Sequence, residues 1–149
     1  MAMSFLRSAL LLVAMGTSAS PVSAQVARLP IADGIWVKAE TACGTAAIAY
    51  VKRAGRFGSV YFYGPNQSMG PANETEVVSH VGRGENGFSV INDGPIEVAA
   101  RPNGRAVVRA FSLSEGVQWT ENIRLCAPTT LSAKLRAGLA RVGLGVSPR

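Results

Sequence analysis

The sequence has few of the side chains on which enzyme and metal chemistry usually depends. It contains one histidine, His80, and two cysteines in 149 residues. Its only aspartates are Asp33 and Asp93, and the patterns H-E-x-x-H, C-x-x-C and G-x-S-x-G do not occur. The sequence therefore offers few of the residues that a Ser-His-Asp triad or a zinc centre needs. We predict a protein that is not an enzyme and that uses no cofactor and no metal.

Charged residues are also scarce, at 16% of the chain, whereas 48% of the residues are hydrophobic. This composition argues against intrinsic disorder. The net charge of +6 is uneven, because residues 25–126 hold ten basic and nine acidic residues, while 127–149 hold four basic residues and no acidic one. No basic groove interleaved with aromatic residues is evident, so we expect no nucleic acid as a partner.

No apolar run reaches the roughly 20 residues that span a bilayer. The longest, Ala9 to Met15, follows Arg7 and precedes the small residues Val22-Ser23-Ala24. This layout predicts a secretory signal at 1–24, so we expect a soluble periplasmic or secreted protein. We divide the rest into an N-terminal extension at 25–33, a β domain at 34–126 and a basic tail at 127–149.

Cys43 and Cys126 lie 83 residues apart, near the two ends of the predicted β domain. Export makes a disulfide the expected state of such a pair. Closing a loop of this length contributes about 4 to 5 kcal/mol in the chain-entropy model. The alternative, a nucleophilic thiol, would need His80 as its base. We favour the disulfide.

Turn pairs separate short segments that are rich in β-branched and aromatic residues. Asn86-Gly87, Asp93-Gly94 and Asn103-Gly104 suit tight hairpins, in which both turn positions have positive φ. They help to delimit eight predicted strands, at 34–40, 46–52, 59–64, 75–81, 87–92, 95–101, 105–113 and 117–125. The sequence therefore predicts an all-β antiparallel meander. We favour a small barrel over a sandwich, because closure removes exposed strand edges.

The last predicted strand shows one irregularity in its alternation. An apolar face is formed by Val117, Trp119, Ile123 and Leu125, and Glu121 interrupts it. Glu121 marks either a β-bulge or an inward carboxylate with a partner, and the bulge is the commoner explanation.

Two motifs in the sequence resemble ligand sites. Residues 82–87 satisfy G-x-G-x-x-G, but a strand pattern follows at 88–91 where a dinucleotide loop needs a helix, so we interpret the motif as a hairpin turn. Glu74, Glu76 and His80 have the same parity on one predicted strand. Because Glu76 and His80 would be about 13 Å apart, we expect a solvated face and not a metal site.

The most informative candidate for function is a long polar connection at 64–73, next to two tyrosines. Loops of this length often carry function, and aromatic side chains with a polar tip are enriched at interfaces. We predict binding residues that contact an envelope protein or glycan, namely Tyr61, Tyr63, Asn66, Gln67 and Met69. The alternative is a carrier of a small apolar ligand in the barrel lumen, for which small inward candidates are Ala46, Ala47, Ala49, Ala99, Ala100, Ala106 and Ala110.

The tail has helical periodicity, with Leu131, Leu135, Leu139 and Val142 on one stripe. We predict a helix capped by Thr129 or Thr130 and ended by Gly143, in which Gly138 costs about 1 kcal/mol relative to alanine. We favour docking of the helix on the β domain, and the alternatives are weak contact with an anionic membrane surface or a disordered tail. The basic residues available for that contact are Lys134, Arg136 and Arg141.

One resemblance rests on Gly34-Ile35-Trp36 followed by Cys43, with Cys126 closing a β meander. In this outline, which covers residues 34–126, the chain is similar to small secreted bacterial β proteins and loosely resembles periplasmic lysozyme inhibitors. The resemblance implies a short eight-stranded barrel closed by a disulfide. The Ser-Gly-x-x-Tyr loop typical of one inhibitor group is absent, so no residue inherits an inhibitory role.

Overall fold

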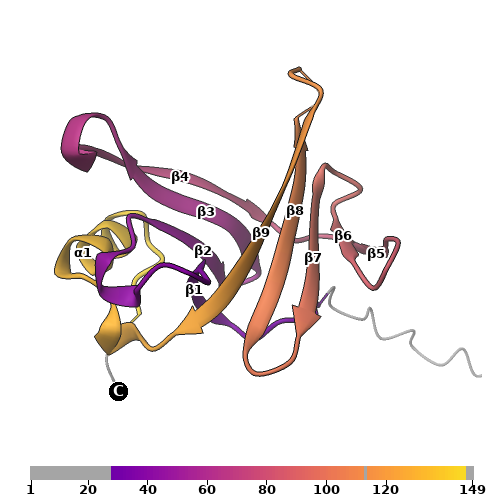
Figure 1. The fold of residues 1–149 in the computed structure, drawn as a ribbon, viewed down its shortest axis with the longest axis horizontal. Coiled ribbons are helices and arrows are strands. Elements are labelled where there is room, and N and C mark those ends of the chain that lie inside the picture. Colours follow the sequence, from indigo (N-terminus) through magenta and orange to yellow (C-terminus); the bar gives the residue numbers. More distant parts are fainter. Residues whose placement is uncertain (1–27, 113, 147–149) are drawn as a thin grey trace, which may run out of the picture.

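A computed structural model describes residues 28–112 and 114–146. The predicted secretory signal lies outside these residues. The described chain forms one antiparallel sheet, three short 3-10 turns and a C-terminal helix (Figure 1). The strands are β1 (Gly34–Lys38), β2 (Ile48–Arg53), β3 (Arg56–Tyr63), β4 (Met69–Val77), β5 (Val81–Arg83), β6 (Ser89–Ile91), β7 (Ile96–Arg101), β8 (Arg105–Ser112) and β9 (Val117–Cys126). The 3-10 turns are Cys43–Thr45, Pro65–Gln67 and Pro128–Thr130, and the helix is α1 (Ala133–Arg141).

The nine strands follow the order β4-β3-β2-β1-β9-β8-β7-β6-β5, and β1 pairs with β9. The edge strands β4 and β5 are consecutive in the sequence, so the sheet curls until its two edges approach each other. The protein is therefore a half-barrel, which confirms the all-β meander with a C-terminal helix and rules out the sandwich. There are nine strands instead of eight because the predicted strand at 75–81 is divided between β4 and β5.

The prediction of a loop at 64–73 is wrong for the second half of that segment, which is a strand. After the single turn at Pro65–Gln67, the chain enters β4 at Met69 and pairs with β3. Glycine and proline normally indicate a loop, but Pro71 lies on an edge strand, where its missing N–H leaves no ladder bond broken. The register shifts between Tyr61 and Tyr63, which absorbs the irregular backbone.

Asn92 holds the two edges of the sheet together near the end of β4. Its Oδ1 accepts from the backbone N–H groups of Ser79 and His80 at 2.9 and 3.0 Å. Its Nδ2 donates to the Val77 carbonyl at 2.7 Å and to Glu76 Oε2 at 3.1 Å. The Asn92 side chain thus supplies hydrogen-bond partners to the backbone of the short connection from β4 to β5, where the chain is not paired with another strand.

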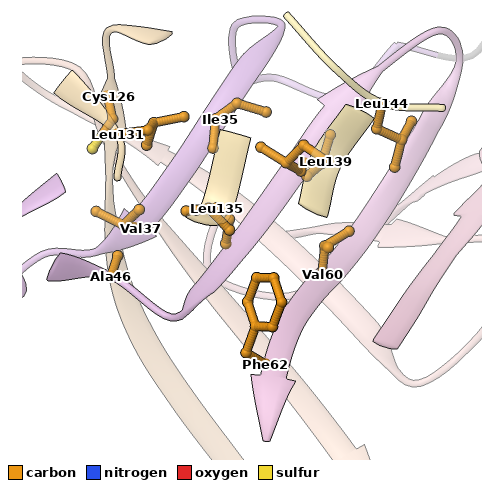
Figure 2. Packing of buried hydrophobic residues seen from close by; sticks show 12 residues of the cluster. Ile35, Val37, Ala46, Val60, Phe62, Cys126, Leu131, Leu135, Leu139 and Leu144 are labelled. Carbon is orange, nitrogen blue, oxygen red and sulfur yellow. The ribbon is translucent and has the colours of Figure 1, made fainter. Parts of the chain in front are cut away.

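Two hydrophobic clusters lie on opposite faces of the sheet. The inner cluster fills the concave side and contains Leu29, Ile31, Trp36, Phe57, Ile91, Val98, Ala106, Val108 and Ile123. The outer cluster lies between α1 and strands β1, β2 and β3, and it contains Ile35, Val37, Ala46, Ala49, Val51, Val60, Phe62, Cys126, Leu131, Leu135, Leu139 and Leu144 (Figure 2). Strand β1 is buried on both faces, because Trp36 points inward while Ile35 and Val37 point to the helix.

The C-terminal helix docks on the sheet through its leucine stripe. Ser132 caps it, accepting from the Leu135 N–H at 3.1 Å, so the predicted caps Thr129 and Thr130 are wrong because they lie in the preceding 3-10 turn. A Cβ on Gly138 would lie 2.7 Å from Phe62 Cζ. This glycine is therefore required for close approach to β3.

Cys43 and Cys126 form the predicted disulfide, which joins the turn after β1 to the end of β9. The G-x-G-x-x-G motif is the predicted hairpin turn, since β5 and β6 on either side of it pair antiparallel. None of the helices in the described part of the chain is long and apolar enough to cross a membrane.

Candidate functional site

Aromatic side chains gather on the concave face beyond the inner cluster. Tyr50 on β2, Tyr61 and Tyr63 on β3, and Trp119 on β9 have the same parity as the inward residues of their strands. These are all three tyrosines and one of the two tryptophans of the chain. We call them the aromatic face. Figure 1 shows the β3-β4 and β8-β9 hairpins, which carry three of these residues, diverging from each other.

Two carboxylates are built into the aromatic face. Tyr50 donates its hydroxyl to Glu121 at 2.6 Å, and Tyr61 donates to Glu74 at 2.8 Å. The Lys38 ammonium lies 3.9 Å from Glu121 and 3.3 Å from Glu40. Tyr50 and Tyr61 are thus each held by an acidic residue of another strand.

Glu121 is the inward carboxylate with a partner, and the favoured β-bulge is wrong. The pairing of β8 with β9 continues through Val108 opposite Glu121 without a shift. A carboxylate is tolerated here because its neighbours supply a hydroxyl donor and a cation. Of the predicted apolar face on β9, Ile123 is buried, whereas Trp119 is 45% exposed because the hairpin extends past the inner cluster.

The environment favours the protonated form of two tyrosines. Burial, followed by the hydrogen bond to Glu121, raises the pKa of Tyr50. The hydrogen bond to Glu74 raises the pKa of Tyr61. Both hydroxyl protons are committed to carboxylates, so the face offers a ligand mainly ring surface and carboxylate oxygens. Such groups attract cations and apolar side chains.

The predicted binding residues lie in different parts of this region. Tyr61 and Tyr63 come together, with ring centroids 6.1 Å apart, and Met69 is paired opposite Tyr63 at the exposed tip of β4. Gln67 lines a pocket of about 210 Å³ that is also bordered by Ile48, Tyr50 and Glu121. Asn66 is exposed in the adjoining turn.

Sequence reasoning missed Tyr50, Glu74, Glu121 and Trp119 as members of this face. Glu121 carried a local signal, since it broke an apolar alternation. Tyr50 and Trp119 carried none, because β2 and β9 are joined only through β1 and are distant in sequence, as the Tyr50 to Glu121 separation of 71 shows. Glu74 was missed because the segment before it was predicted as a loop, whereas β4 pairs it with β3.

The concave side deeper in the half-barrel is filled by side chains of the inner cluster. Leu29 and Ile31, from the segment before β1, pack there with Trp36 and Phe57. Several of the small inward candidates face away from the lumen. Ala46 and Ala49 pack in the helix-side cluster, and Ala99 packs against Phe88.

Across residues 28–112 and 114–146, no three His, Cys, Asp or Glu side chains are grouped so as to hold a metal ion. The predicted strand joining Glu74, Glu76 and His80 ends at Val77, and His80 lies beyond it, 3.4 Å from Asp93. No protein-family model, curated protein or solved structure matches this chain.

Proposed function

We propose that this protein is an exported, non-enzymatic binding module of the cell envelope, and that its ligand is a protein that docks on the aromatic face. The observation that carries the proposal is that all three tyrosines and Trp119 share the inward parity of the curled sheet, with Tyr63 and Trp119 each 45% exposed. Tyrosine and tryptophan supply most of the energy in many protein interfaces, because they bury a large area at a low entropy cost.

The carboxylates indicate the chemistry of the partner. Glu74 accepts from Tyr61 and Ser59, and no described cation forms an ion pair with it. A partner that presents lysine or arginine side chains would neutralise Glu74 and stack on the tyrosine rings. A glycan would also stack on the rings but would leave this charge uncompensated, so a basic protein segment is favoured.

A pull-down from envelope extract tests the proposal. The variant Tyr61→Ala/Tyr63→Ala should lose its specific partner, while Phe111→Ala, which removes an exposed aromatic residue from the other face, should retain it. Glu74→Gln should weaken capture and reduce its dependence on salt. If the double variant captures the same partners as the wild type, the aromatic face is not the binding surface.

A further inference from the structure

The opposite end of the sheet carries a second unusual surface, formed by arginines. Strands β7 and β8 join through the tight turn Arg101-Pro102-Asn103-Gly104-Arg105. In the strand register Arg101 lies opposite Arg105, and Arg105 lies opposite Arg124 of β9. Three arginines are therefore neighbours across three adjacent strands on the outer face. We call them the arginine cluster.

The arginine cluster is not neutralised within the described chain. None of the three forms an ion pair with a described carboxylate, whereas nearby Arg109 pairs with Glu97. Arg101 donates to the Ala100 carbonyl at 2.9 Å and Arg124 to the Thr41 carbonyl at 2.7 Å. Like charges directly opposite each other in a sheet are destabilising, so this arrangement has a cost that an external anion would relieve.

Other groups at the same end extend the positive charge sideways. Lys52, Arg53 and Arg56 lie at the turn between β2 and β3, where Asp33 pairs with Lys52 at 2.5 Å. Glu76, also near this end, accepts from Asn92. Two apolar side chains at the sheet ends are exposed, Val77 at 57% and Leu125 at 39%. Lys52 and Arg56 line a pocket of about 400 Å³ together with Arg28 and Asp33, and none of the three arginines of the cluster borders it.

We propose that the arginine cluster binds the surface of an anionic phospholipid bilayer. Guanidinium groups recognise lipid phosphates, and a laterally extended surface can satisfy dispersed cations without a shaped pocket. Leu125, which follows Arg124 on β9, adds an exposed apolar side chain that suits the headgroup boundary. In this orientation the aromatic face, at the opposite strand ends, points away from the bilayer.

This surface replaces the helix as the membrane contact. The Lys134 ammonium lies 4.6 Å from the centroid of the Phe62 ring and donates to the Gln67 carbonyl. Arg141 donates to the Gly70 carbonyl, and Arg136 donates to the Leu131 carbonyl at 2.7 Å. The helix cations are thus held against the protein's own backbone, as Arg101 and Arg124 also are, whereas Arg105 makes no described side-chain hydrogen bond.

Vesicle co-sedimentation tests the proposal, with the purified protein and vesicles of equal parts phosphatidylcholine and phosphatidylglycerol. The variant Arg101→Gln/Arg105→Gln/Arg124→Gln should bind about a hundredfold more weakly, since each basic residue near the surface contributes about fivefold. The matched Arg→Lys triple variant keeps the charge and should stay within a few-fold of the wild type. Arg105→Gln alone should lose about fivefold, and it breaks no described side-chain hydrogen bond.

Four results with vesicles would overturn the proposal. These are no binding of the wild type to the anionic vesicles, equal binding to pure phosphatidylcholine, full binding by the Arg105→Gln and triple glutamine variants, and loss of binding instead in Lys134→Gln/Arg136→Gln/Arg141→Gln. Tighter binding to duplex DNA than to vesicles at equal phosphate concentration would assign the surface to nucleic acid and also overturn it.

Discussion

The two halves of the half-barrel are stabilised differently. Strands β1, β2 and β3 have apolar side chains on both faces, because the inner cluster covers one side and α1 covers the other. Strands β7, β8 and β9 share the inner cluster, but most of their outer face carries arginines and neutral polar side chains. Phe88 covers a small part of it, packing on Ala99 and Val107 beneath the guanidinium groups of Arg101 and Arg109. The helix thus stabilises the outer face of the covered half, whereas the outer face of the open half, which carries the arginine cluster, is left exposed.

The largest effect should come from the disulfide, which joins the covered half to the end of β9. Cys43→Ser/Cys126→Ser should lower the free energy of unfolding by about 4 kcal/mol, because the unfolded chain regains the entropy of an 83-residue loop. The thermal midpoint should fall by roughly 15 °C. Calorimetry of both forms checks this, and a fall of only one or two degrees would mean that packing alone fixes this junction.

A matched pair of substitutions compares the outer faces of the two halves directly. Leu135→Ala, under the helix, should cost about 3 kcal/mol, because it opens a cavity at a fully buried position. Phe111→Ala on β8 should cost less than about 0.5 kcal/mol, because this side chain is 40% exposed. Urea denaturation of both variants measures the difference. Equal costs would remove the distinction between the halves.

Replacing Gly138 of α1, in the covered half, by alanine should lower the stability of the protein, contrary to the helix propensities of the two residues. Alanine normally stabilises a helix by about 1 kcal/mol over glycine, but Gly138→Ala should destabilise by about 1 to 2 kcal/mol. Its Cβ would lie 2.7 Å from Phe62 Cζ. Adding Phe62→Leu should recover part of the loss in a double-mutant cycle, whereas independent additive effects would show that the contact with Phe62 is not the cause.

The smallest effect concerns the hydrogen bond between Tyr50 on β2, in the covered half, and Glu121 on β9, in the open half. The pKa of Tyr50 is raised in the folded protein, so its hydroxyl bond to Glu121 persists while an unfolded tyrosine would ionise near pH 10. Stability should therefore be complete below about pH 10 and decline as the pH rises above it.

Tyr50→Phe should reduce this alkaline decline by at most about 1 kcal/mol, as followed by denaturation at several pH values. Tyr63→Phe, which removes an exposed hydroxyl, is the control. An unchanged decline in Tyr50→Phe would assign the alkaline effect to other groups.

Local patterns were sufficient for the fold class and the helix stripe. Period-2 alternation predicted most strands, and Leu131, Leu135 and Leu139 predicted the face by which α1 docks. They failed at β4, where glycine and proline indicated a loop. Pairing with β3 and the edge position of Pro71 outweighed that local preference, because ladder bonds from a long neighbouring strand stabilise an otherwise weak segment.

Only part of the candidate site could be predicted from the sequence. Tyr61 and Tyr63 are two residues apart on one strand, so alternation alone places them on one face. Tyr50 lies on β2, whereas Trp119 and Glu121 lie on β9, which is distant in sequence, and nothing local brings these strands together.

The sequence by itself therefore determined the β alternation, the disulfide partners and the amphipathic helix, because each depends on the spacing or the number of a few residue types. Only the tertiary structure decided which sheet edges approach each other, that position 138 has no room for a Cβ atom, and which charged side chains become neighbours. Sheet curvature and strand order bring Glu121 to Tyr50 and leave Arg101, Arg105 and Arg124 side by side. The contact between Tyr50 and Glu121 joins residues 71 apart in sequence, and the free energy of such a long-range pairing appears only when the whole sheet forms.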